Sequence, residues 1–180
     1  MDVSKEQAII EYLLGLDNYR RDSEHGDFTP NNGCDSVKNN RLFFNFLVAS
    51  DSNKQFVTMA NDKVLNRNYV DGSVMKRYSF TIIDFRSVNY QPLVKDVSIF
   101  PKSENIEEYL DIQGIIDWIT EQNDVRNYPI FGSKCIIDTI RTTTESPNLN
   151  GVDTNAQPVL AKYSMTIQID YLDTTKRVWN

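Results

Sequence analysis

The chain has 180 residues, of which 40% are hydrophobic and 24% are charged, a composition typical of one folded domain. Its 25 acids outnumber its 19 Lys and Arg residues, so the formal net charge is −6, which opposes attraction to nucleic-acid phosphates. No apolar run reaches the roughly 18 residues of a membrane span, and acids interrupt the apolar N-terminal stretch. We therefore expect neither a membrane role nor secretion through a cleaved signal.

The charge is divided along the chain into blocks of opposite sign. Residues 1–35 carry −5, residues 36–103 carry +5 and residues 104–138 carry −6, whereas the remainder is neutral. One interpretation is that these charges lie on scattered faces that contact only solvent. The other is that copies of the chain associate through opposite patches, because complementary charges steer and align association.

The first predicted element is a helix from about residue 5 to residue 14. Ser4 and Gln7 have the spacing of a capping box, in which side chains satisfy the free N–H groups of the first helical turn. Residues 17–40 are polar and aperiodic, so we expect a long loop there. A loop of this length indicates either a binding role or simple mobility.

Four strands in two hairpins are expected next. The strands of the first pair are predicted to be joined by a turn after residue 50. The second pair meets at Asp71-Gly72-Ser73, because Asp-Gly suits the positive φ values of tight hairpin turns. In chain order, the four strands are expected at residues 42–48, 55–60, 64–70 and 75–86.

A second long loop and a long helix follow. Residues 87–103 contain two prolines and no clear period, which predicts the loop. The helix is expected to begin near Ser103 or Asn105 and to end between residues 123 and 129, with acids outside its apolar stripe. The stripe consists of Tyr109, Ile112, Ile116 and Ile119.

The last two strands are expected at residues 135–142 and 159–172, with a polar loop between them. The final strand alternates strictly between two sets of positions, which predicts one buried face and one wet face. Strands that arrive in hairpins, without regular alternation with helices, predict an α+β fold over the single domain 1–180. We expect an antiparallel sheet of about four to six strands with two helices packed on one face and a hairpin extension.

No catalytic or cofactor-binding motif occurs in the sequence. The one histidine, His25, has no nucleophile pattern beside it, and the neighbouring Glu107 and Glu108 point about 100° apart on a helix. Cys34 and Cys135 have no CxxC or Cys/His arrangement around them. We therefore predict a protein without enzymatic activity, cofactor or metal that acts by assembly or binding.

Several stretches, taken together, resemble the bacteriophage tail-terminator family. They cover about half of the chain in the family's order. They are the opening helix ending YLLGL, the hairpin YVDGS followed by KRYSFTI, the helix IQGIIDWITEQN followed by NYP, and the final strand VLAKYSMTIQIDYL.

The resemblance implies a structural virion protein, assembled in the host cytoplasm, that forms a homo-hexameric ring. Such a ring caps the tail tube, ends tube polymerisation and docks the tail to the head connector. The implied partners are further copies of the chain, the tail tube protein, a head-completion or connector protein and, as a further candidate, a sheath protein. DNA would pass through the lumen without specific binding.

The hairpin is the candidate contact with neighbouring subunits or the tube, and the alternative is an ordinary exposed turn. Trp118 and Tyr163 match the family pattern and are expected in the core. Two other functions stay open: another neck or head-completion protein, and a small-ligand-binding or enzymatic α+β domain. The candidate contact residues are Tyr69, Asp71, Gly72, Ser73 and Lys76.

Overall fold

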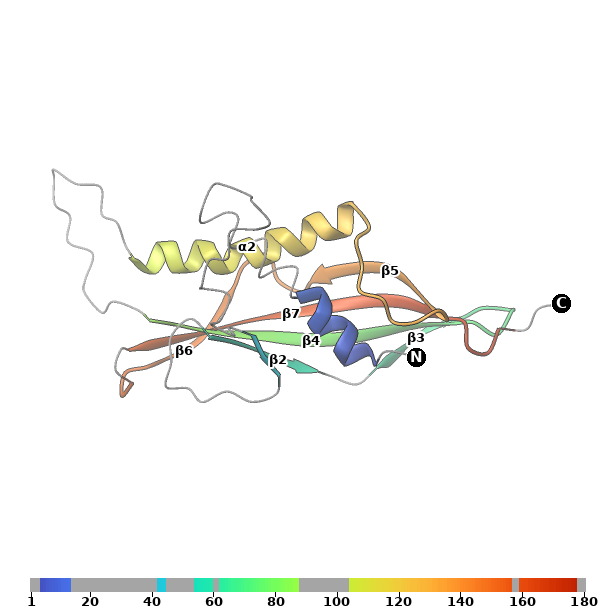
Figure 1. The fold of residues 1–180 in the computed structure, drawn as a ribbon, viewed down its shortest axis with the longest axis horizontal. Coiled ribbons are helices and arrows are strands. Elements are labelled where there is room, and N and C mark those ends of the chain that lie inside the picture. The colour runs from blue at the N-terminus through green and yellow to red at the C-terminus, as the bar shows by residue number, and fades with distance from the viewer. Residues whose placement is uncertain are drawn as a thin grey trace, which may run out of the picture.

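A long sheet covered on one face by two helices forms the described part of the chain (Figure 1). The α+β fold class is therefore confirmed. Apart from Ser87, which belongs to a strand, the long loops expected at residues 17–40 and 87–103 lie outside the described residues. The computed structural model describes residues 4–13, 42–44, 54–59, 62–87, 104–156 and 159–177.

Two long strands form the axis of the sheet. β4 (Val74–Ser87) and β7 (Leu160–Asp173) pair antiparallel along their whole length, from Val74 opposite Asp173 to Ser87 opposite Leu160. The alternation of β7 specifies this register, because a slip by one residue would turn its apolar side chains to the solvent. The predicted final strand is confirmed.

Two shorter strands share the outer edge of β4. β3 (Lys63–Asn68) forms the predicted hairpin with β4, and β2 (Lys54–Met59) pairs with β4 further along. The first predicted hairpin is wrong, because β1 (Leu42–Phe44) runs parallel to β2, and parallel neighbours cannot be joined by a tight turn. The local alternation predicted strands here but carried no information on which strand each would pair with.

The outer edge of β7 is likewise shared, by β5 (Cys135–Thr142) and β6 (Asn148–Asp153). β6 lies in the segment that was expected to be a loop. Its residues are all exposed and include two Asn and one Gly, which are depleted in strands, so its pairing with β7 rather than its composition makes it a strand. The described sheet therefore has six antiparallel strands and a short parallel one, β1.

The core lies between the sheet and the two helices. Gln7 N–H donates to Ser4 Oγ at 3.2 Å at the start of the N-terminal helix (residues 5–13), which is one half of the predicted capping box; the side-chain amide of Gln7 donates to Glu11 instead. α2 (Glu104–Asp124) buries the three isoleucines of its predicted stripe and partly buries Tyr109, and both Trp118 and Tyr163 are buried as expected. Among the largest side chains that are fully buried are Ile9, Leu13, Phe80, Ile112, Ile115, Ile119, Met165 and Tyr171.

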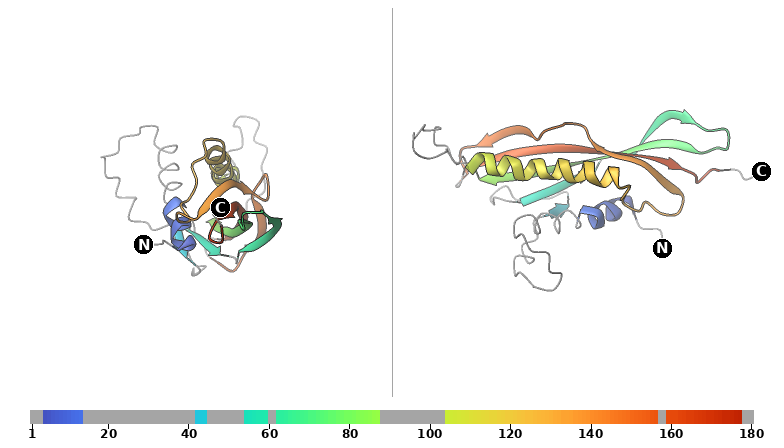
Figure 2. Two further views of the ribbon diagram at one scale, coloured as in Figure 1. Left: turned by 90° about the vertical axis from the view of Figure 1, so that its right-hand side faces the viewer. Right: turned by 90° about the horizontal axis from the view of Figure 1, so that it is seen from above.

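The opposite face of the β4–β7 pair carries polar residues along its middle and the apolar Ile83 and Phe85 towards one end. Hydroxyl groups of Thr81 and Thr166, on neighbouring strands, lie 2.9 Å apart there. Both described helices lie on the other side of the sheet (Figure 2). No helix in the described ranges is long and apolar enough to cross a membrane.

Candidate assembly surface

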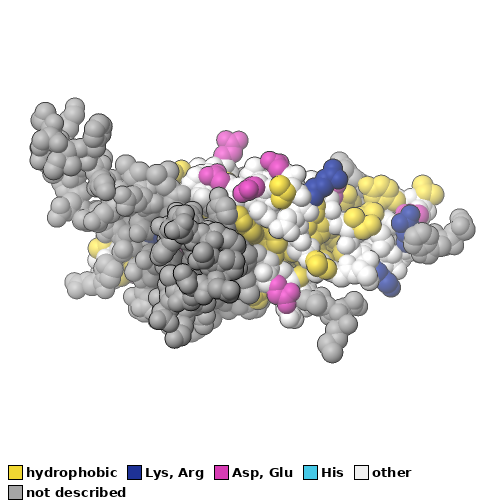
Figure 3. All heavy atoms as spheres, turned by 45° about the horizontal axis from the view of Figure 1, so that its top comes forward, with side chains coloured by type: hydrophobic (Ala, Val, Ile, Leu, Met, Phe, Trp, Pro, Cys, Tyr) yellow, Lys and Arg dark blue, Asp and Glu magenta, His cyan; other side chains and the backbone are white. Residues whose placement is uncertain are grey.

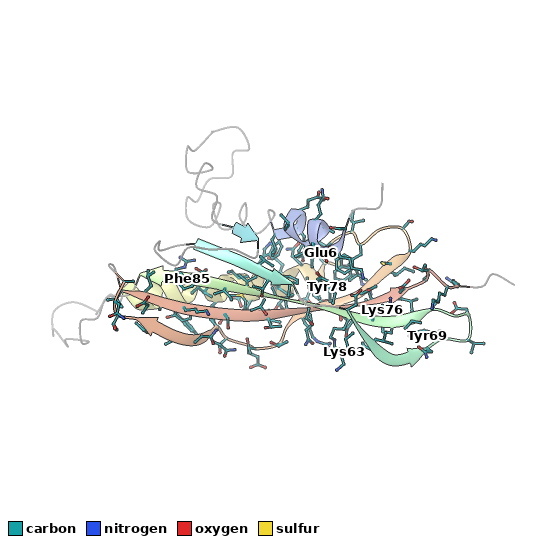
Figure 4. The ribbon with its side chains drawn as sticks, turned by 90° about the horizontal axis from the view of Figure 1, so that it is seen from below. Glu6, Lys63, Tyr69, Lys76, Tyr78 and Phe85 are labelled. Atoms are coloured by element: carbon teal, nitrogen blue, oxygen red, sulfur yellow. The ribbon has the colours of Figure 1, made fainter. Side chains whose placement is uncertain are left out.

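The β3–β4 hairpin extends past the end of the sheet that the helices cover (Figure 1). We call residues 63–77 the hairpin arm; it comprises β3, the turn at residues 69–73 and the beginning of β4. Tyr69 lies towards the outer end of the arm and Lys63 nearer its base, whereas Tyr78 lies beyond the base, where its hydroxyl donates to Glu6 of the N-terminal helix at 3.1 Å (Figure 4). No described strand pairs with the outer edge of β3.

The turn of the arm is a three-residue loop closed by a glycine. Tyr69 N–H donates to the Ser73 carbonyl at 2.9 Å, and Gly72 N–H donates to the Tyr69 carbonyl at 3.0 Å. Gly72 has φ +85°, whereas Asp71 does not have a positive φ. The expected turn with two positive φ values is therefore wrong in detail, because only the glycine takes the left-handed conformation.

The C-terminal turn packs against this loop. Arg177 Nε lies 2.9 Å from Asp71 Oδ2, and Ser73 N–H donates to Asp71 Oδ1 at 3.0 Å. The hydrogen bonds from Ser73 and, to a smaller extent, the positive charge of Arg177 hold the pKa of Asp71 below its usual range. Thr174 N–H donates to the Lys134 carbonyl at 2.9 Å, which attaches this turn to the start of β5 as well.

Two of the predicted contact residues, Ser73 and Lys76, are buried or paired within the chain. Ser73 is 1% exposed, and Lys76 Nζ lies 2.7 Å from Asp173 Oδ2. This hydrogen bond raises the pKa of Lys76. Partial burial favours a higher pKa for Asp173, but the hydrogen bonds from Lys76 and Thr175 outweigh it and hold that pKa well below its usual range. Ser73 therefore offers no surface to a partner, and the charge of Lys76 is already paired within the chain.

Exposed apolar side chains gather at what we call the arm end, which comprises the whole hairpin arm, the residues at the start of β5 and the turn at residues 174–177. Tyr69 is 46% exposed, Val64 is 53% exposed and Val70 is fully exposed. Ile136 of β5, 55% exposed, lies level with the base of the arm, because Leu172 pairs with Ile136 on one side and Met75 on the other. The sequence prediction included Tyr69 but missed the other three, although a valine inside a turn, where polar residues are usual, was an available signal.

The charges of the chain are segregated between α2 and the arm end. α2 contains seven acids and no Lys or Arg, and its exposed Asp117, Glu121 and Asp124 follow one another at helical spacing on one face. Residues 62–77 contain four cations and two acids. Acidic side chains accordingly gather over α2, whereas basic and hydrophobic side chains appear at the arm end (Figure 3).

The base of the arm is anchored to the N-terminal helix. Lys5 Nζ forms an ion pair with Asp62, directly before β3, and donates to the Tyr171 hydroxyl. The same ammonium lies 4.6 Å from the ring centroid of Tyr171 and 5.8 Å from that of Tyr78. These contacts are those of a cation held by aromatic rings, so the cluster ties the helix to the sheet. Burial raises the pKa of both tyrosines.

The described ranges contain one further buried ion pair and a free thiol. Asp84 and Arg86 form a buried ion pair on the core side of β4, with contacts of 2.9 and 3.1 Å. Cys135 is a free thiol, and burial raises its pKa. No group of three or more His, Cys, Asp or Glu side chains within the described residues is arranged to hold a metal ion.

The arm end is therefore the candidate site for contact with another protein. It combines an unpaired strand edge, exposed apolar side chains and a turn held by the C-terminal segment. The sequence matches no protein-family model and no curated protein.

Proposed function

We propose that this chain is a structural virion protein that forms a homo-hexameric ring on the end of a phage tail tube. The ring ends tube polymerisation and docks the tail to the head connector. The observation that carries this proposal is the hairpin arm, whose strand edge is unpaired among the described residues and whose outer end exposes Tyr69 and Val70. Proteins usually cover or charge such an edge, and apolar patches beside it mark interaction sites.

A closed ring needs two different and complementary surfaces on each subunit. The chain offers two candidates, because the arm end is apolar and basic while the outer face of α2 is acidic. The resemblance of the sequence to tail terminators supplies the identity of the ring and of its partners.

The mass of the purified full chain tests the proposal. We expect an assembly of about six times the 20.8 kDa of one chain, with six-fold rings in negative-stain images. Particles lacking the protein should have tails of uncontrolled length that are not joined to heads, and supplying the wild-type chain should restore them. A chain that stays monomeric, together with normal joined tails in its absence, would overturn the proposal.

Copurification separates this function from that of a head-completion protein. A tail terminator should copurify with isolated tails before heads are attached. A protein found with filled heads but not with isolated tails would instead belong to the head side of the neck.

A further inference from the structure

We infer that the subunits of the assembly contact one another through the hairpin arm of one copy and the outer face of α2 of the next copy. This inference rests on the proposed self-assembly and names the surfaces that carry it. The arm extends past the C-terminal end of α2, so it is directed away from the helix of its own chain (Figure 1). A second chain can therefore receive it without competition from the first.

The arm end has the properties of a preformed docking element. The Asp71–Arg177 ion pair and the hydrogen bonds across the turn hold its outer end in one conformation. A fixed conformation lowers the entropy that is lost on binding. Val64, Tyr69 and Val70 provide the apolar surface that association would remove from water.

The outer face of α2 complements the arm end in charge. Asp117, Glu121 and Asp124 lie on the solvent side of the helix, and no other described residue forms an ion pair with them. The cations at the arm end that are likewise exposed and without an ion pair to another described residue are Lys63, Lys134 and Lys176.

Opposite charges on separate surfaces of one chain favour a second copy as the partner. Each exposed ion pair stabilises association by only about 0.2–1 kcal/mol. The charges would therefore set the alignment of the subunits while the apolar side chains supply much of the affinity. Because the two surfaces differ, the contact is head-to-tail and can close into a ring.

Two charge-reversed forms of the full chain test this contact. The arm variant carries Lys63→Glu and Lys176→Glu, and the helix variant carries Asp117→Lys and Glu121→Lys. All four side chains are exposed, so the fold should persist, which far-UV circular dichroism and thermal unfolding would check. A control with Glu11→Lys and Asp153→Lys changes the net charge as the helix variant does, at exposed positions outside both surfaces; Asp153 pairs with Leu160, at the end of β7 remote from the arm.

We expect each variant alone to associate at least tenfold more weakly than the wild type, and the control to assemble normally. An equal mixture of the two variants should assemble again, because each reversed surface then meets the opposite sign on the other chain. A structural defect in either variant would not be repaired by mixing. Sedimentation velocity or mass photometry would follow the assembly.

The other outcomes overturn the inference and can be told apart. If wild type and both variants assemble equally, the ring exists but its contacts lie elsewhere, and the proposed function stands. If the variants are monomeric and their mixture stays monomeric, these two surfaces do not meet. If the arm variant assembles normally but no longer binds tail tubes, the arm contacts the tube protein. A monomeric wild type would overturn both the inference and the proposed function.

Discussion

Replacing Gly72 with alanine tests how the arm is held in its observed conformation. The residue has φ +85°, and a Cβ added there would lie 2.5 Å from the backbone carbonyl oxygen of Lys176. A non-glycine residue in the left-handed region costs about 1–2 kcal/mol. The close contact adds to this, because it can be relieved only if the turn at residues 174–177 moves, which would disturb the Arg177–Asp71 ion pair.

We therefore expect Gly72→Ala to lower the free energy of unfolding by about 2 kcal/mol, within the range of about 1–3 kcal/mol for strained backbone positions. For a chain of this size that corresponds to a fall in Tm of roughly 4–8 °C. The assay is thermal unfolding followed by circular dichroism, with all variants at one protein concentration because assembly also stabilises the fold.

Gly114→Ala is the matched control. This glycine lies within α2, and a Cβ added there would have no neighbour within 4 Å. Alanine in a helix interior is favoured over glycine by about 0.5–1 kcal/mol, so this variant should unfold at a higher temperature. Equal shifts of the two variants in the same direction would refute the reasoning about Gly72.

Three further predictions follow from the charges. Asp84→Ala removes one partner of the buried Asp84–Arg86 ion pair and should cost about 3–5 kcal/mol of stability in urea unfolding, so an unchanged urea midpoint would contradict a stabilising role of this pair. The pKa of Asp173 is lowered in the folded chain, so its charge stabilises the fold above about pH 4, the unfolded value, and this contribution is lost as the pH falls below it. In Asp173→Asn, the free energy of unfolding should therefore fall less steeply as the pH drops below this value. An identical slope in the variant and the wild type would show that Asp173 does not contribute in this way. Self-association should weaken as NaCl rises from about 0.05 M to about 0.5 M, whereas salt-insensitive assembly would indicate an apolar contact.

The predictable parts of the fold are those whose signal lies within one segment. The alternation of β7 and the apolar stripe of α2 each occur within about twenty neighbouring residues, so both elements and their buried faces were predicted. The hairpin of the arm was predicted for the same reason, since its turn residues lie between its strands. β6 and the parallel pairing of β1 were missed, because a strand of weak propensity forms when a distant strand offers it an edge.

The residues of the candidate site could likewise be predicted only where the signal is local. Tyr69 was predicted as a contact residue from the hairpin tip and is exposed there, whereas Ser73 and Lys76 of the same hairpin turned out to be bound within the chain. The partner of Lys76, Asp173, comes from the other end of the sequence, so no local pattern could indicate that this charge is paired, whereas Ser73 is buried and its backbone is bound within its own turn. The anchoring cluster around Lys5 was missed for the same reason, because its members are separated by up to 166 positions.

The α+β class, the long final strand, the acidic helix and the division of the charge into blocks could all be derived from the order of the residues. These properties depend on composition and on periods of two or 3.6 residues. Which charges are exposed and which are neutralised inside the chain, and that the exposed apolar residues lie at one end of the sheet, became visible in the folded chain alone. The reason is that pairing across the sheet brings distant segments within hydrogen-bonding distance, and such pairing leaves no trace in the order of neighbouring residues.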